Sequence, residues 1–257
     1  MNSMLERFYR AKQPEIEFLR QLAQKGELPQ PFTGHRPSFL QALALRRPAV
    51  IAEYKRASPS RGSINLGLEP EEAAAQYAAA GAACLSVLTE SEYFKGDLGF
   101  LQRMTGPGLP LLRKDFIFTA GQVTATAATP ASALLLIVRM LDADTLKSLI
   151  ALSADFGIVP VVEIFDEADL LRARAAGATV IQVNNRDLDT LRVDCQTSVD
   201  LVAGRKAGEV WISASGIGSA GQLASLLGCG FDAALVGSSL MGSADSPGAA
   251  LQRLLEG

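Results

Sequence analysis

The segment "IVPVVEIFDEADLLRARAAGATVIQVN", Ile158 to Asn184, contains one complete strand–helix–strand pattern. An apolar run at 158–164 is followed by a stretch at 166–178 that begins with acidic residues and has Gly177 near its end. A second apolar run follows at 179–184. Acidic residues at the start and glycine at the end are typical of a helix. Short apolar runs are typical of parallel strands buried on both faces. The segment therefore predicts a βαβ unit.

The same alternation continues along the chain. "EPEEAAAQYAAAGA" repeats the helix pattern with a proline at its start. Six further apolar runs predict strands at 50–54, 83–88, 109–114, 133–138, 209–213 and 233–237. Eight strands that alternate with helices, without a linker, predict an α/β fold of the (β/α)8 TIM-barrel type. A doubly wound open sheet is the alternative, but it has no natural place for eight equivalent units.

We expect one domain that spans residues 1–257. Residues 49–257 are predicted to form the barrel. Residues 1–48 are predicted to be an extra N-terminal helical segment that covers one end of it. With 48% hydrophobic residues, the chain is able to bury a large core.

Charge and hydropathy exclude several classes of partner. The net charge is −3 and basic runs are missing from the sequence, which argues against nucleic acid. The longest apolar run, "ALLLIVRML", is too short to cross a bilayer. The N-terminus lacks the apolar block of a signal peptide. We therefore expect a cytoplasmic protein without a membrane partner, either a monomer or a weak homo-oligomer.

Cysteine and histidine usage argues against a metal site. Cys84, Cys195 and Cys229 are widely spaced and form no CxxC motif, so we expect reduced, small core residues. His35 is the only histidine, and zinc sites usually combine histidine with cysteine. The sequence predicts no metal.

Polar residues stand where the predicted strands end, and catalytic side chains of barrels lie at the carboxyl ends of strands. Because side chains alternate along a strand, Ile51, Glu53 and Lys55 share one face, which we expect to point inward. Other strand ends carry Lys114, Asp115, Glu163, Asn184, Asn185 and Arg186. A single polar residue at a strand end is more often exposed to solvent than catalytic. Burying two lysines and two glutamates together is costly unless they pair or meet a ligand.

The last two predicted strands end in small residues. "SASGIGS" contains Gly216 and "LVGSSL" contains Gly237, each beside a hydroxyl residue. Glycine lets backbone N–H groups approach a ligand closely, and a following helix N-terminus favours an anion. Phosphate sites of barrels commonly follow strands 7 and 8. We therefore expect a phosphorylated small molecule, on which lysines and carboxylates transfer protons without a metal.

Specific motifs resemble one family. "IAEYKRASPSRG", "LSVLTESEYFKGDL", "LLRKDFIF", "VPVVEIFDEADL", "NNRDL" and "VGSSLM" follow one another as in indole-3-glycerol phosphate synthase, over almost the whole chain. The resemblance implies a barrel with an N-terminal extension and the fifth step of tryptophan biosynthesis. In that step 1-(2-carboxyphenylamino)-1-deoxyribulose 5-phosphate closes a ring and loses CO2 and water. The resemblance implies that no cofactor is needed.

Matching positions imply roles for individual residues. Lys114 resembles the general acid of ring closure, and Glu163 the carboxylate that handles protons during dehydration. Lys55 resembles a second lysine near the substrate carboxylate, which Glu53 would orient. Asn184 would hydrogen-bond the reacting hydroxyl. The remaining matched positions would contact anions: Arg186 and, for the phosphate, Ser58, Ser215, Gly216, Gly237 and Ser238.

Two positions depart from the family pattern. Ala214 replaces the glutamate of the usual "SESGI", and Gln182 replaces a glycine of the usual "IGINNR". One hypothesis is that the Gln182 amide fills the space of the missing glutamate; the alternative is independent drift. The departures also leave open a specialised paralogue that accepts a ring-substituted substrate. A non-catalytic phosphate-binding barrel is a further alternative, and a phosphoribosylanthranilate isomerase is disfavoured because its catalytic pair differs.

Overall fold

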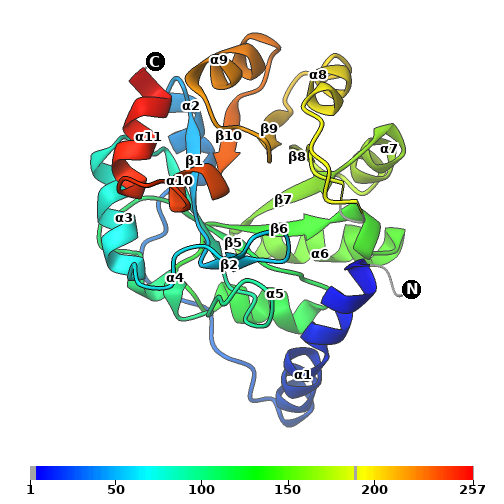
Figure 1. The fold of residues 1–257 in the computed structure, drawn as a ribbon. Helices are drawn as coiled ribbons and strands as arrows, with labels where there is room; N and C mark the ends of the chain where they lie inside the picture. The colour runs from blue at the N-terminus through cyan, green and yellow to red at the C-terminus, as the bar shows by residue number, and fades with distance from the viewer. Residues whose placement is uncertain (1–3, 188–189, 257) are drawn as a thin grey trace.

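A computed structural model describes residues 4–187 and 190–256, so Leu188 of the "NNRDL" motif lies outside the described residues. Eight parallel strands close into a barrel in the order β1-β10-β9-β8-β7-β6-β5-β4 (Figure 1). They are β1 Val50–Tyr54, β4 Cys84–Leu88, β5 Leu111–Lys114, β6 Ala133–Ile137, β7 Val159–Ile164, β8 Val180–Asn184, β9 Val210–Ala214 and β10 Ala233–Val236. The predicted (β/α)8 barrel is confirmed, and each predicted strand end differs from the observed one by no more than two residues.

Helices surround the barrel as the sequence pattern predicts (Figure 1). They are α3 Pro70–Ala79, α4 Phe100–Arg103, α5 Ala120–Ala127, α6 Ala143–Asp155, α7 Glu167–Ala175, α8 Gln196–Val202, α9 Ala220–Gly228, α10 Ser238–Met241 and α11 Pro247–Glu256, with a 3-10 turn at Val138–Met140. After β1, Ala57–Ser58 (β2) and Gly62–Ser63 (β3) form a small antiparallel pair. Asp166 caps α7 by accepting a hydrogen bond from the Asp169 N–H, and Gly177 ends its C-terminal turn with a φ of 92°.

Strand alternation divides the core into two layers. Ile51, Leu112 and Leu135 belong to the cluster that fills the barrel interior. Ala52 and Tyr54 belong to the cluster between strands and helices. Each large apolar side chain that is fully buried contributes about 1.5–3 kcal/mol. The parity that buries Ile51 inside the barrel also turns Glu53 inward, toward the carboxyl end.

The N-terminal extension contacts both ends of the barrel, so the prediction that it covers one end is only half right. Helix α2, Phe39–Leu45, packs Phe39 and Leu43 into the interior cluster beside Ala49, at the amino ends of the strands. Helix α1, Met4–Lys25, lies along α5 and brings Phe8 to the opposite end. The extension therefore also borders the mouth where catalysis is expected.

The three free cysteines differ in burial, which corrects the expectation that all are core residues. Cys84 is buried, and burial raises the pKa of its thiol. Cys195 is half-buried and Cys229 is exposed, because both lie at helix termini on the surface. Among the helices described, none is long and apolar enough to span a membrane.

Candidate active site

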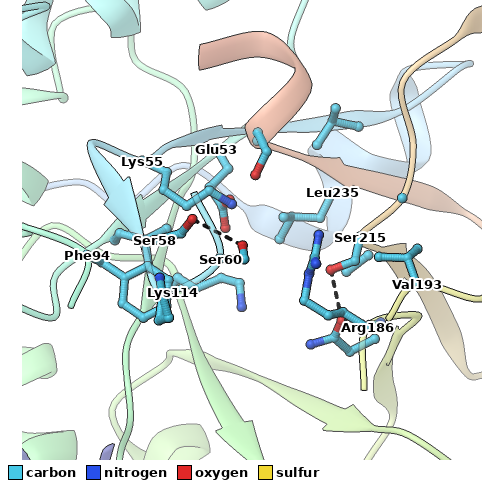
Figure 2. A pocket seen from close by; sticks show the side chains of 18 of the residues that line it. Glu53, Lys55, Ser58, Ser60, Phe94, Lys114, Arg186, Val193, Ser215 and Leu235 are labelled. Carbon is cyan, nitrogen blue, oxygen red and sulfur yellow. Dashed lines mark hydrogen bonds and ion pairs between the residues drawn. The ribbon is translucent and has the colours of Figure 1, made fainter. Parts of the chain in front are cut away.

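A cavity of about 680 Å³ lies at the carboxyl ends of the strands. Its volume falls in the range of roughly 300–1,000 Å³ that is common for ligand sites. All the site residues predicted from the sequence line it: Glu53, Lys55, Ser58, Lys114, Glu163, Asn184, Arg186, Ser215, Gly216, Gly237 and Ser238. In Figure 2, Lys55 and Lys114 lie on one side of the cavity and Arg186 and Ser215 on the other.

Glu53 and Lys55 form an ion pair at the end of β1. The Lys55 Nζ lies 2.6 Å from Glu53 Oε2, and the Glu53 side chain is only 4% exposed. The Tyr77 hydroxyl donates to the Glu53 backbone carbonyl at 3.1 Å and fixes the strand there. A Cβ on Gly237 would overlap the Glu53 carboxylate. Gly237 therefore leaves room for Glu53, a reason for glycine that sequence reasoning missed.

Glu163, at the end of β7, binds three side chains. Gln182 Nε2 donates to its Oε2 at 2.5 Å, and Asn184 Nδ2 donates to its Oε1 at 3.2 Å. Lys114 Nζ lies 3.6 Å from Glu163 Oε2, which is an ion pair but too long for a hydrogen bond. The Lys114 ammonium therefore remains available to donate to a ligand in the cavity.

An ionic network holds the strand that carries Lys114. The Asp115 carboxylate binds Lys12 of α1 at 2.9 Å, Arg113 at 2.8 Å and the Thr89 hydroxyl at 2.6 Å. Burial alone would raise the pKa of Asp115, but the charges of Arg113 and Lys12 hold that pKa below its usual value. Asp115 is therefore engaged as a structural anion, and α1 is fastened to β5 next to the predicted acid.

The residues predicted to bind the phosphate form an arc after β1, β10 and β9, which are neighbours in the barrel: Ser58, Ser215, Gly216, Gly237 and Ser238. Ser215 and Gly216 both have positive φ, 71° and 82°, so two successive residues adopt the left-handed conformation. Arg186 reaches the cavity from the end of β8; burial, and then the charge of Arg61, lowers the pKa of its guanidinium. Arg61 was missed by sequence reasoning, although it follows the Ser-Pro-Ser turn.

An aromatic wall faces the cavity beside β4 and β5. The rings of Phe8 and Phe116 stack with centroids 4.2 Å apart, and Phe94 lies 6.1 Å from Phe116. Glu90 accepts hydrogen bonds from the backbone N–H groups of Tyr93 and Phe94, which orders the loop after β4. The wall suits a flat aryl group. Sequence reasoning missed it because its three rings come from separate parts of the chain.

Gln182 does not fill the space beside Ala214, so that hypothesis is wrong. Gln182 is in register with Ile212 on β9, whereas Ala214 is in register with Asn184. Gln182 is fully buried beneath the cavity and turns toward β7. Ala214 lines the cavity with its methyl group.

Metal-ligating side chains do not gather in the described part of the chain: within 4–187 and 190–256, no three His, Cys, Asp or Glu residues are placed to hold an ion. The polar groups of the cavity instead include Lys55, Lys114, Arg61 and Arg186. These cations favour an anionic ligand.

The fold and the site define a (β/α)8-barrel enzyme whose cavity at the strand ends contains two lysine–carboxylate pairs. The family model for indole-3-glycerol phosphate synthase matches residues 5–254, and the chain belongs to that family. It is 42% identical over 238 residues to the indole-3-glycerol phosphate synthase of Desulfosudis oleivorans, covering 92% of this chain and 89% of the relative. It is 40% identical to that of Aquifex aeolicus, covering 93% and 92%.

Solved structures of low sequence identity share the fold alone. 3-Hexulose-6-phosphate synthase from Salmonella typhimurium superposes with a TM-score of 0.63 at 17% identity, covering 81% of this chain and 97% of that one. Thiamine phosphate pyrophosphorylase from Pyrococcus furiosus superposes with a TM-score of 0.59 at 16% identity, covering 81% of this chain and 94% of that one. Both agree with the closed barrel described above.

Proposed function

We propose that this protein is an indole-3-glycerol phosphate synthase of tryptophan biosynthesis. It converts 1-(2-carboxyphenylamino)-1-deoxyribulose 5-phosphate into indole-3-glycerol phosphate, CO2 and water. Family membership supports the reaction. The single observation that carries the proposal is that one cavity combines two lysine–glutamate pairs, an aromatic wall and an arc of anion-binding groups.

The cavity accounts for each part of this substrate. The aryl ring packs against Phe94 and Phe116. The phosphate lies at the arc formed by Ser58, Ser215, Gly216, Gly237 and Ser238, where Arg61 and Arg186 add positive charge. The ribulose carbon atoms lie between these two regions, near Lys114 and Glu163. The substrate carboxylate lies within reach of Lys55.

Ring closure forms a bond between the ring carbon that bears the carboxylate and the carbonyl carbon of the ribulose. Lys114 donates a proton to the carbonyl oxygen, which becomes a hydroxyl. CO2 then leaves, and the electron pair of its bond restores the aromatic ring. Lys55, oriented by Glu53, binds the carboxylate before it departs.

In the dehydration step, one of the lysines donates a proton to the new hydroxyl, which leaves as water. The neighbouring carbon then loses a proton. Glu163 takes up that carbon-bound proton, while Asn184 hydrogen-bonds the reacting hydroxyl. Lys114 Nζ lies 3.6 Å from Glu163 Oε2. A proton gained by Glu163 therefore has a short route back to a neutral Lys114. The other donated proton, which the loss of CO2 consumes overall, is replaced from water before the next turnover.

The test is to incubate the purified protein with the carboxyphenylamino ribulose phosphate and follow indole fluorescence. We expect turnover that Lys114→Ala abolishes while ligand binding persists. Lys147→Ala, which removes an exposed lysine of α6, is the matched control and retains activity. A wild-type protein that binds the substrate without turnover contradicts the proposal and favours a binding barrel.

A ring-substituted substrate is the second candidate, because Ala214 lines the cavity with only a methyl group. Turnover of a substituted analogue alone would favour it. We further propose that the barrel and its extension act as one domain. We place the enzyme in the cytoplasm, as a monomer or a weak homo-oligomer, which size-exclusion chromatography tests.

A further inference from the structure

Gln182 is a buried amide that touches a site carboxylate from below. It lies on β8 in register with Glu163 on β7, and its side chain is 0% exposed. Its Nε2 donates to Glu163 Oε2 at 2.5 Å. On the other side of β7, Glu163 is in register with the apolar Ile137 of β6. Among the described residues, Gln182 thus makes the shortest polar contact with this carboxylate, ahead of Asn184 at 3.2 Å and Lys114 at 3.6 Å.

The other end of this amide is unsatisfied. Within the described residues, the buried Gln182 Oε1 has no hydrogen-bond partner. A buried acceptor left without a partner reduces stability, whereas an apolar side chain of similar length carries no such cost. Stability of the fold therefore does not explain why an amide stands at this position. Its hydrogen bond to Glu163 offers a functional reason instead.

We propose that Gln182 is a positioning residue that supports Glu163 in both of its protonation states. While Glu163 is ionised, Nε2 donates to Oε2. When Glu163 carries a proton, a half-turn about the terminal torsion of Gln182 brings Oε1 to the same place, where it accepts the O–H of the acid. No described group donates a hydrogen bond to Oε1, so the turn breaks no hydrogen bond on that side. The inference rests on the proposed proton transfer by Glu163.

The charged and polar groups around Glu163 show why Gln182 is suited to support both protonation states. Lys114 of β5 is the cation that contacts Glu163, at 3.6 Å, and the contact from Asn184 of β8 is uncharged. Glu53 and Lys55 of β1 pair with each other, and Arg186 lines the cavity from the end of β8. Among the described residues, Gln182 and Asn184 are the side chains that hydrogen-bond to Glu163, and of the two Gln182 is fully buried.

The test variant is Gln182→Met, which keeps the length of the side chain and removes both the donor and the acceptor. We expect kcat to fall about tenfold, the effect of losing roughly one hydrogen bond to a charged group, with KM changed less than about twofold. The acid limb of the kcat profile moves to higher pH, because the ionised carboxylate loses a stronger bond than the neutral acid does. The melting temperature stays equal or rises.

Ile212→Val is the matched control, since Ile212 lies in the same barrel layer and has no polar contact with Glu163. We expect its pH profile to equal that of the wild type. In the background of Glu163→Gln, Gln182→Met has no further effect on kcat. A Gln182→Met protein with wild-type kcat and pH profile, or with a clearly lower melting temperature, overturns the inference alone. Absence of turnover in the wild type overturns the proposed function as well.

Discussion

Gly237, directly after β10, faces Glu53 of β1 so closely that a single added Cβ overlaps the carboxylate. Glu53 in turn holds Lys55 at 2.6 Å. The position of the lysine ammonium thus depends on a glycine that is far from it in sequence. Gly237, predicted from the sequence to contact a phosphate, therefore also makes room for the Glu53–Lys55 pair.

Gly237→Ala is expected to lower kcat more than tenfold, because the methyl group displaces Glu53 and with it Lys55. Indole fluorescence under saturating substrate measures the change. Gly221→Ala in α9 is the control, since its Cβ meets nothing within 4 Å. Equal activity of the two variants would show that Glu53 tolerates displacement.

Asp115→Asn is expected to destabilise the fold by about 1.5–3 kcal/mol, because it removes the fully buried anion that Lys12 and Arg113 share and leaves them only the partly exposed Glu15 as counter-ion. Denaturant unfolding at neutral pH measures the loss. Asp155→Asn, at an exposed position near the end of α6, is the control and changes stability by less than about 0.5 kcal/mol. A loss below about 1 kcal/mol in Asp115→Asn would mean that the network is dispensable.

The same carboxylate predicts a pH dependence. The pKa of Asp115 is lower in the folded protein than its usual value. Its contribution is therefore complete above the unfolded pKa of about 3.9 and is lost as the pH falls below that value toward the folded pKa. Unfolding curves from pH 6 to pH 2 should show a steeper acid loss in the wild type than in Asp115→Asn. Parallel curves would contradict this assignment.

Much of the barrel follows from local sequence features. Apolar runs such as 159–164 define the strands, and alternation correctly turned Glu53 and Glu163 toward the mouth. Whether a side chain points into or out of the barrel follows from alternation along its own strand. Its height along the barrel axis relative to residues of the next strand depends on the stagger of the closed barrel. The level of Gln182 relative to Ala214 was therefore misjudged, although both point inward.

Contacts between distant segments were beyond the reach of sequence patterns. Lys12 lies on an amphipathic helix and meets Asp115 across a separation of 103 residues. The stack of Phe8 on Phe116 likewise requires α1 to dock against the barrel mouth. Neither pairing has a local signature, because each depends on how the extension packs.

Arg61→Ala is expected to raise KM for the phosphorylated substrate about tenfold and to leave kcat nearly unchanged, because Arg61 binds substrate and transition state equally. Its Nη1 donates to the Ser238 carbonyl at 3.2 Å, which places the guanidinium beside the anion arc. Competition by inorganic phosphate should weaken in parallel. Arg253→Ala, on the exposed face of α11, is the control and keeps the wild-type KM.

Gln182→Gly and Ala214→Glu are expected to act independently, because the two side chains lie in different layers and Gln182 bonds to β7 instead of β9. Their effects on the free energy of unfolding should add within about 0.5 kcal/mol in the double variant. The measurement is a double-mutant cycle by denaturant unfolding. A coupling above about 1 kcal/mol would mean that the glutamine does share space with position 214, and that drift at one site constrained the other.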